Sequence, residues 1–205
     1  ADRYATARAV AERTVSILGS GYSGSAFVAT GANFPDALGA SPISAARGWP
    51  IYLVKPTGID ADLVTSMKAA GVSRILPLGG TAVISAATES QLASQLGASS
   101  QRLQGSDRFE TARVVATWGV TSAGMGWDNV AIATGMNFPD ALSGGVLQGR
   151  SNSVMLLTLP DVLHDGVRTT LADNRTTISG VRFLGGTGAV SDAVRAAVVS
   201  ALQTP

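Results

Sequence analysis

The sequence contains no cysteine and only one histidine, His164. A chain without cysteine cannot form disulfides, thiol nucleophiles or haem attachment sites, and a single histidine cannot supply the grouped ligands of common zinc sites. We therefore predict that the protein holds no metal ion and uses no cofactor.

Charge and long apolar runs are also scarce. Charged residues make up 14% of the chain and the formal net charge is +1, so no field of one sign steers the molecule toward nucleic acid or an anionic membrane. No apolar run reaches the roughly 18 residues that span a bilayer. The chain begins at Ala1 without methionine or a signal-peptide pattern, as expected of a mature or trimmed segment.

The residues that are present suit a globular protein. Hydrophobic residues make up 45% of the 205 residues, which allows a buried core in one large domain or two small ones. Internal repetition favours two, because three motifs occur twice, in the same order, 104 to 106 residues apart. The motifs read Asp-Arg-[Tyr/Phe] at 2–4 and 107–109, Ala-Thr-Gly-x-Asn-Phe-Pro-Asp-Ala-Leu at 29–38 and 133–142, and Leu-Gly-Gly-Thr at 78–81 and 184–187.

The boundary between the repeats falls in the small, polar stretch 97–100. We predict two tandem domains, residues 1–98 and 99–205. Residues 101–105 precede the second Asp-Arg-Phe motif and have no counterpart before Asp2. The first domain is therefore expected to be truncated at its N-terminus.

Each repeat alternates short apolar runs with longer stretches of helical period. This alternation predicts an α/β fold, with two small three-layer domains built on mainly parallel sheets. The expected strands are 26–29, 51–54, 74–78, 130–133, 154–157 and 181–184. The expected helix starts are N-capping Ser85 and Ser191, first-turn Pro35 and Pro139, and a capping-box variant at Asp107 and Glu110.

Ligands of parallel α/β domains gather at the carboxyl ends of the strands. The loops expected there lead into helix starts, whose N–H groups can accept an anion. The structural alternative is that the glycines permit positive φ, that Asn33 and Asn137 stabilise turns, and that Asp36 and Asp140 complement helix dipoles. Both interpretations stay open at this point.

Arg3 and Arg108 each follow an aspartate that is expected to cap a helix. A planar guanidinium suits carboxylates and phosphates. These arginines are therefore expected to contact either an acidic ligand or the neighbouring domain through an ion pair.

Catalytic patterns are weak in this sequence. Residues 186–191 approximate a dinucleotide-binding pattern, but Ala82 breaks it in the first repeat. Asp60 and Asp62 are not retained in the second repeat, so they are expected to be helix-start acids rather than metal ligands. His164 is expected to be solvated. Duplicated motifs without an acid–base set favour binding, and we predict that the protein is not an enzyme.

Taken together, the three duplicated motifs resemble the type 2 cell-wall-binding repeat family of Gram-positive surface proteins. The resemblance covers nearly the whole chain in two copies. It implies a secreted protein held non-covalently at the cell wall, with Toprim-like repeats that bind an anionic secondary wall polymer. It also implies pseudo-threefold packing of repeats, within a chain or between chains, so that further repeats are expected partners.

Carried onto this sequence, the resemblance gives specific candidate residues. The expected ligand-binding residues are Arg3, Arg108, Asn33, Asn137, Thr81 and Thr187. The family's Ile-Leu-Leu-like strand matches 51–53 and 155–157, which the apolar pattern itself predicts to be buried. Trp49 and Trp127 are expected to be exposed, and either to stack on sugars or to cover turns.

Two other functions remain compatible with the sequence. The first is an enzyme that uses the strand-end loops as a nucleotide or phosphoryl-transfer site, with Asp36 or Asp140 as the acid–base group. The second is a purely architectural platform for a partner protein.

Overall fold

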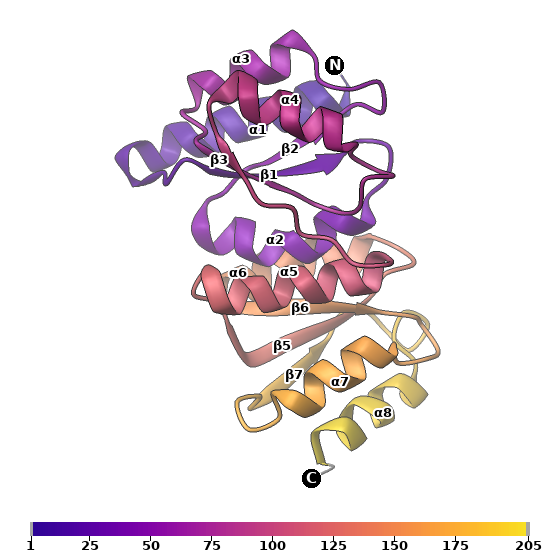
Figure 1. Cartoon of the computed structure of the whole chain (residues 1–205). Coiled ribbons are helices and arrows are strands. Elements are labelled where there is room, and N and C mark those ends of the chain that lie inside the picture. Colours follow the sequence, from indigo (N-terminus) through magenta and orange to yellow (C-terminus); the bar gives the residue numbers. More distant parts are fainter. Residues whose placement is uncertain (1, 204–205) are drawn as a thin grey trace. The chain divides into compact units, whose positions relative to one another are not determined.

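The computed structural model describes residues 2–203 (Figure 1). Its backbone contacts divide the chain into two compact units. Unit 1 is formed by the residues up to Ala37 and by Gly48–Gln104, and unit 2 by Leu38–Arg47 and the residues from Gly105 onward. Each unit contains one parallel sheet and is described separately below.

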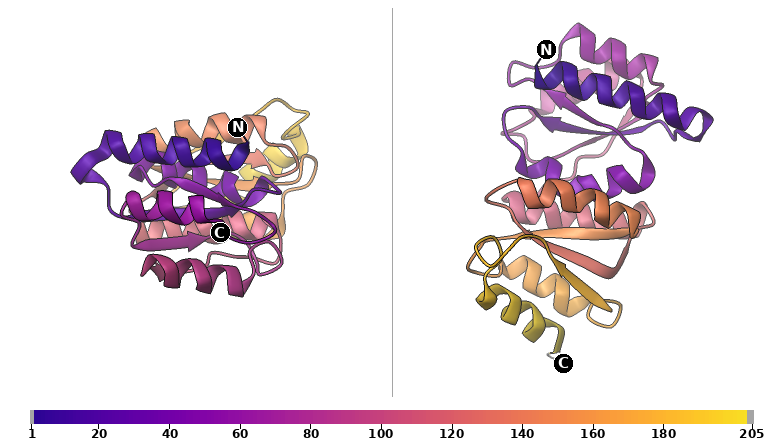
Figure 2. Two further views of the ribbon diagram at one scale, coloured as in Figure 1. Left: turned by 90° about the horizontal axis from the view of Figure 1, so that it is seen from above. Right: turned by 180° about the vertical axis from the view of Figure 1, so that it is seen from behind.

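Unit 1 contains a four-stranded parallel sheet in the order β2-β1-β3-β4. Helix α1 packs along β2, and α3 and α4 pack against each other on one face of the sheet (Figures 1 and 2). The elements are α1 (Arg3–Leu18), a short 3-10 helix (Gly19–Gly21), β1 (Ser25–Thr30), α2 (Pro35–Arg47), β2 (Ile51–Val54), α3 (Ala61–Ala69), β3 (Arg74–Pro77), α4 (Ala86–Leu96) and β4 (Ser99–Ser100).

Unit 2 contains a three-stranded parallel sheet in the order β6-β5-β7. Helix α6 contacts β5 and β6, whereas α7 and α8 pack together on the opposite face (Figure 1). The elements are α5 (Arg108–Ser122), β5 (Gly126–Thr134), α6 (Pro139–Arg150), β6 (Ser153–Thr158), α7 (Asp165–Asp173), β7 (Gly180–Phe183) and α8 (Asp192–Gln203).

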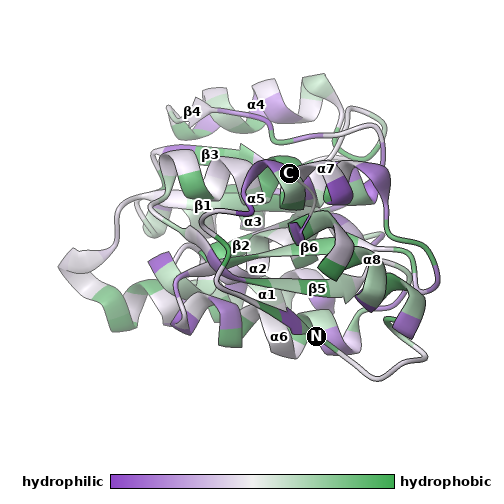
Figure 3. Ribbon diagram, turned by 90° about the horizontal axis from the view of Figure 1, so that it is seen from below, coloured by the Kyte–Doolittle hydropathy of each residue, from purple (hydrophilic) through white to green (hydrophobic). Residues whose placement is uncertain are grey.

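These elements confirm the predicted α/β class and the mainly parallel sheets. Strands β1 and β6 are buried along their full length, as expected for strands covered on both faces, and Figure 3 shows the apolar residues concentrated along the strands. Pro35 and Pro139 open α2 and α6 as predicted, and the Ser85 side chain caps α4 by accepting from Thr88 N–H. Among residues 2–203, no helix is both long and apolar enough to cross a membrane.

The prediction that the two tryptophans are exposed and stack on sugars was wrong, whereas the alternative of a packing role is compatible with the structure. Trp49 and Trp127 are only 9% and 7% exposed. Trp49 packs its ring against Phe27, with ring centroids 5.9 Å apart. Both indoles belong to the packed interior, because an aromatic ring beside a strand contributes more by burial than by exposure.

Unit 2 includes ten residues of α2, and small side chains allow their close packing against α5. A Cβ added to Gly39 would lie 3.0 Å from the Ala112 Cα, and one added to Gly119 would lie 2.7 Å from Ile43 Cδ1. Arg47 ends this helix by donating to the carbonyl of Ala123. The domain limits 1–98 and 99–205 describe the sequence repeats and stay a prediction.

Candidate functional site

Unit 1 has a hollow of about 300 Å³ where β1 and β2 end and the loop after β3 begins. We call it the unit 1 groove. Asn33 and Thr81, two of the predicted ligand-binding residues, both line it, so the fold brings together loops that are far apart in sequence. The groove is lined by Thr30, Ala32, Asn33, Val54, Lys55, Pro56, Thr81, Ala82, Val83, Ile84, Ser85 and Thr88.

The Asp-Arg-aromatic motif fixes the loop after β1, which borders the groove. Asp2 caps α1 by accepting from Ala5 N–H, and this backbone hydrogen bond lowers the pKa of the Asp2 carboxyl. Arg3 Nη1 donates to the carbonyl of Gly31 at 2.7 Å. The Tyr4 ring occupies the space where a Cβ on Gly31 would lie, which explains the glycine.

The second repeat builds the same arrangement inside unit 2. Asp107 caps α5 as predicted, Arg108 Nη1 donates to the carbonyl of Gly135 at 3.0 Å, and Phe109 packs against Gly135. Each arginine therefore positions the strand-end loop of its own repeat. Arg3 is exposed and Arg108 half-buried, and because a guanidinium carries five N–H donors, each keeps donors beyond the one used here.

The Asn-Phe-Pro-Asp motif forms a turn at the start of the following helix. Thr30 Oγ1 accepts from Ala32 N–H, and Asn33 Oδ1 accepts from Phe34 N–H at 3.1 Å. Asn137 accepts from Phe138 N–H in the same way, at 3.0 Å. Asn33 and Asn137 are exposed and use only their side-chain carbonyl oxygen in these bonds. The turn hydrogen bonds therefore do not involve their amide N–H groups.

Glycine is required in the Leu-Gly-Gly-Thr loop for two reasons. Gly79 has a φ of +86° and Gly185 a φ of +98°, and a Cβ at either position would meet a carboxylate, that of Asp36 or Asp140. Thr81 and Thr187 follow in exposed positions. The two aspartates lie close to this loop from the first turns of α2 and α6, the position from which the structural alternative has them complement the helix dipoles.

An arginine that the sequence analysis missed secures this loop in each unit. Arg102 donates to the carbonyls of Gly79 and Ile84, both at 2.7 Å, and pairs with Glu89 at 2.7 Å. Arg195 donates to the corresponding carbonyls in unit 2, those of Gly185 and Val190, both at 3.0 Å.

The two arginines occupy different places in the repeat. Arg102 follows β4, whereas Arg195 lies in α8 at the position that corresponds to Glu89 in α4. A search for repeated residues could not find them for this reason. The available signal was a charge reversal, glutamate in one repeat and arginine in the other, at one helix position.

Charged residues meet beside the unit 1 groove. Lys55 Nζ lies 2.8 Å from Asp60 Oδ2 and 5.6 Å above the Tyr4 ring, and Arg8 lies 3.1 Å from Asp62. The hydrogen bond from Lys55, followed by that from Leu63 N–H, lowers the pKa of the Asp60 carboxyl, while Asp60 raises the pKa of Lys55. The acids at the start of α3 are thus paired, as expected of helix-start acids.

His164 replaces Asp60 in the second repeat, and the prediction that it is solvated was wrong. Its side chain is 20% exposed and caps α7 by accepting from Gly166 N–H through Nδ1. Its ring also packs 5.1 Å from that of Phe109 and lies 3.5 Å from Asp107 Oδ2. An imidazole nitrogen can cap a helix where aspartate would otherwise do so.

The capping box at α5 is only half formed. Asp107 accepts from Glu110 N–H as predicted, but the Glu110 carboxylate pairs with Arg113 at 2.7 Å. Arg113 therefore draws the glutamate away from the helix start. In the part of the chain that is described, no three or more His, Cys, Asp or Glu side chains are grouped to hold a metal ion.

The Ile-Leu-Leu-like strand is fully buried in unit 2 but only partly in unit 1, where Ile51 and Leu53 are half-buried and the prediction of burial was wrong for them. Tyr52 is fully buried in β2, and Met155, Leu156 and Leu157 are fully buried in β6. Burial raises the pKa of the Tyr52 hydroxyl. The fully buried side chains therefore contribute to the core and not to an exposed binding surface.

A family model for cell wall binding domain 2 matches residues 1–89 and 102–195, one segment in each repeat. The chain belongs to this family. The predicted resemblance is thereby confirmed, and the chain is a non-catalytic cell-wall-binding module with a role at the cell wall or surface.

Two curated proteins of Bacillus subtilis (strain 168) are similar to the chain. It is 26% identical over 194 residues to the N-acetylmuramoyl-L-alanine amidase LytC, which covers 94% of the chain and 36% of the amidase. It is 28% identical over 168 residues to an amidase enhancer, which covers 81% of the chain and 21% of that protein. The chain thus spans about a third or less of the length of these relatives.

Two solved structures from Clostridium difficile share the fold. Cwp6 matches with a TM-score of 0.83 at 20% identity, over 98% of this chain and 30% of Cwp6. Cwp8 matches with a TM-score of 0.72 at 20% identity, over 87% of this chain and 29% of Cwp8. The likeness to Toprim domains stays a prediction.

Proposed function

We propose that the chain is a secreted anchoring module that binds an anionic secondary polymer of the Gram-positive cell wall non-covalently. The observation that carries the proposal is the family match in both repeats. The geometry supports it, because Asn33 and Thr81 line one groove and Arg3 is bonded to the neighbouring Gly31. Arg108, Asn137 and Thr187 are the corresponding candidates in unit 2.

The arrangement favours binding over chemistry. Asp36 and Asp140, the acid–base candidates of the enzyme alternative, are half-buried against Gly79 and Gly185, and Asp36 is not among the residues that line the unit 1 groove. A general acid or base has to come within hydrogen-bond reach of a reacting group. The polar lining of the groove instead suits reversible contacts with hydroxyl groups.

Further repeats of the same family are the second proposed partner. Leu38 and Ile43 of α2 are 3% and 0% exposed within unit 2, whereas Leu142 and Leu147, the corresponding residues of α6, are 57% and 47% exposed. Val146, next to Leu147, is 56% exposed. We propose that this face of α6 packs against another repeat, in the way that α2 packs on α5.

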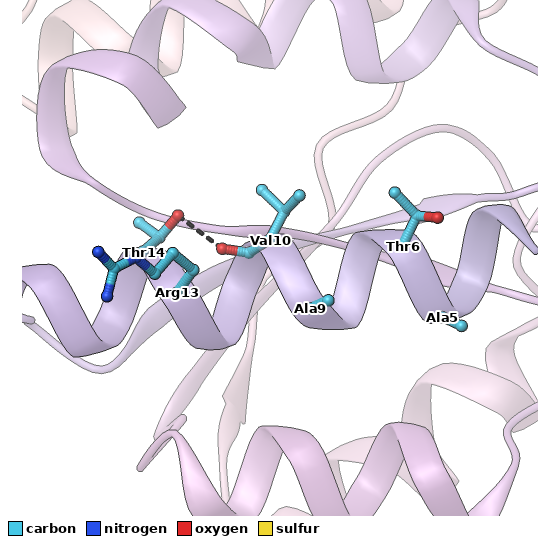
Figure 4. Close-up of a pocket in the computed structure, with 6 residues that line it drawn as sticks. All are labelled: Ala5, Thr6, Ala9, Val10, Arg13 and Thr14. Carbon is cyan, nitrogen blue, oxygen red and sulfur yellow. Dashed lines mark hydrogen bonds between the residues drawn. The ribbon is translucent and has the colours of Figure 1, made fainter. Parts of the chain in front are cut away.

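Helix α1 offers the complementary surface. It corresponds to α5, the helix on which α2 rests, and its outer face has a shallow hollow lined by Ala5, Thr6, Ala9, Val10, Arg13 and Thr14 (Figure 4). Val10 is 60% exposed there, and the Thr14 hydroxyl is turned back onto the Val10 carbonyl at 2.8 Å. With its hydroxyl bonded internally, Thr14 leaves this face largely apolar, which suits a helix of another repeat.

The test of wall binding is co-sedimentation of the purified chain with Gram-positive wall sacculi, before and after acid removal of secondary polymers, across a salt series. We expect co-sedimentation with untreated sacculi, its loss after acid treatment, and weakening with salt, because charge–charge attraction is screened. Binding that survives acid treatment would refute the polymer as ligand. Binding to a partner protein but not to sacculi would favour the architectural alternative.

A further inference from the structure

Resting on the proposed function, we propose that the two repeats are not equivalent binding sites. The unit 1 groove is open and takes one uncharged sugar unit of the wall polymer, whereas the loop after β6 closes the corresponding place in unit 2. Most residues of the strand-end motifs are the same in the two repeats, and the loops between these motifs differ more.

In unit 1 the loop after β2 folds back on itself. Gly58 N–H donates to the carbonyl of Lys55 at 3.0 Å, which forms a tight turn. Pro56 and Ser85 are both exposed, and both line the groove. The turn therefore leaves the start of α4 accessible.

In unit 2 the corresponding loop, 159–163, is held across the start of α8. Ser191 N–H donates to the carbonyl of Pro160 at 2.9 Å, and both residues are half-buried. They correspond to Ser85 and Pro56, the two exposed residues of the unit 1 groove. A backbone carbonyl thus occupies the helix start that a ligand would approach.

One residue difference at the strand end contributes to the divergence of the loops, beside that between Gly58, whose φ of +109° favours glycine, and Val162. Thr158 ends β6, its hydroxyl donates to the carbonyl of Val162 at 3.0 Å, and it accepts from His164 N–H at 2.9 Å. Val54 holds the same position in β2, paired with Thr30 as Thr158 is with Thr134. Valine has no hydroxyl, so it cannot tie the loop down in this way.

The chemistry of the unit 1 groove suits an uncharged sugar. Apart from Lys55, the polar side chains that line it carry hydroxyl and amide groups, those of Asn33, Thr81 and Ser85 among others, and Pro56 and Val83 add apolar surface. A sugar ring presents hydroxyls at its edge and C–H groups on its faces, which match such a mixed lining. A volume of about 300 Å³ is at the lower end for small-molecule sites, which favours one sugar unit.

Charge at the rim argues against a phosphate in the groove. Lys55, Arg8 and Arg3 carry positive charge beside the groove, and three carboxylates, those of Asp2, Asp60 and Asp62, balance them. Lys55 is already hydrogen-bonded to Asp60. An anionic group would therefore gain little here, so we assign the polymer's phosphate or carboxylate groups to other parts of the surface.

The repeats provide matched controls for the test. Asn33→Ala with Thr81→Ala alters the unit 1 groove, and Asn137→Ala with Thr187→Ala makes the same changes in unit 2. Each double variant removes the equivalent turn hydrogen bond of its unit, of 3.1 Å in unit 1 and 3.0 Å in unit 2. Using polymer released from sacculi by mild acid, we expect about tenfold weaker binding for the first pair, which loses two contacts. The second pair should weaken binding less than the first, because the loop after β6 covers the corresponding place in unit 2.

The outcomes separate this inference from the proposed function. Failure of the unaltered chain to bind sacculi would overturn the proposed function. Binding by the unaltered chain with equal losses in both double variants, or a loss in the unit 2 variant alone, would overturn the inference. A Thr158→Val variant that gains a second set of ligand-induced NMR shifts, in unit 2, would support the closing role of Thr158, and unchanged unit 2 spectra would contradict it.

The sugar assignment has its own test by NMR on the whole chain. Free N-acetylglucosamine or glucose at millimolar concentration is expected to shift the amide signals of Thr30–Asn33 and Thr81–Thr88. Inorganic phosphate should leave them in place. Shifts caused by phosphate and not by either sugar would overturn the assignment of an uncharged ligand.

Discussion

At the residue scale, two arginines from different places in the repeat perform one task. Arg102 and Arg195 both bond to the two carbonyls that frame the Leu-Gly-Gly-Thr loop. The first carbonyl is that of a glycine with positive φ, which helix or sheet bonding does not satisfy. Gly79 is buried and Gly185 half-buried, and a carbonyl left without a donor in such a place costs free energy, so each repeat needs some donor at this position.

The first prediction is that the donor can be moved within unit 1. Arg102→Ala should lower the free energy of unfolding by about 2–3 kcal/mol, since hydrogen bonds from a charged donor are lost. Adding Glu89→Arg should restore more than half of the loss, because Arg195 reaches the same two carbonyls from the corresponding helix position. Denaturant unfolding of the three proteins measures this.

The control for this rescue is Glu89→Ala in the Arg102→Ala background. It removes the Glu89 carboxylate, which has lost its partner Arg102, without supplying a hydrogen-bond donor to the loop. If alanine restored as much stability as arginine, charge relief rather than carbonyl bonding would explain the rescue.

At the element scale, the start of α3 depends on the ionised form of one carboxyl. Asp60 caps the helix by accepting from Leu63 N–H at 2.8 Å and bonds to Lys55. Both contacts lower its pKa, so the unfolded chain binds this proton more readily than the folded one. The stabilisation is therefore complete above the ordinary aspartate pKa and is lost as the pH falls through the lowered, folded-state pKa.

The second prediction is that Asp60→Asn flattens the acid limb of the stability curve, that is, the fall in the free energy of unfolding as the pH is lowered. Asparagine keeps an N-cap but cannot ionise, so the free energy of unfolding should fall less between pH 5 and pH 2. We expect a difference of about 1 kcal/mol or less, given partial exposure of the pair. Lys55→Met should have a similar effect, and an unaltered acid limb in both variants would contradict the assigned cause.

The corresponding helices α3 and α7 show how one N-capping residue can be replaced by another. His164 caps α7 in the place where Asp60 caps α3, and Thr158 fixes the loop before it. The helices start at corresponding positions in both repeats, while the loops that lead to them differ. Differences in function between the repeats can therefore arise in loops without any change in the sheets.

At the scale of the whole molecule, apolar residues on α6 remain exposed although their counterparts on α2 are buried. The exposed set follows the helical period, which places it on one face. Exposed residues grouped in this way are typical of an interaction surface. Because the contact would join α6 of one repeat to an α1-type face of another, it is a head-to-tail contact that need not close.

The third prediction is that this face drives association between chains. In sedimentation velocity, the unaltered chain should associate as its concentration rises, and Leu142→Glu with Val146→Glu should keep it monomeric. Both sites are more than half exposed, so the free energy of unfolding should change by only about 0.5 kcal/mol per substitution.

A charge added elsewhere provides the control for that measurement. Val199 on α8 is 48% exposed, and Val199→Glu adds one of the same charges away from α6. It should leave association unchanged. A monomeric unaltered chain at every concentration, or equal disruption by Val199→Glu, would refute the role of α6.

The sequence by itself determined the elements and the architecture of each repeat. Apolar runs located the strands, Pro35 and Pro139 located helix starts, and Asp107 located a cap, since these depend on neighbours within a few residues. Duplication identified the family because three ordered motifs in two copies seldom coincide by chance.

Only the tertiary structure decided what the repeated residues contact. Arg3 bonds to a carbonyl 28 residues away, and Trp49 is buried. Arg102 and Arg195 reach the corresponding loops of the two units from different positions in the repeat. Such contacts depend on which segments the sheet brings side by side, and residue spacing carries no record of this. For the same reason, similar motifs frame an open groove in one repeat and lie beneath a hydrogen-bonded loop in the other.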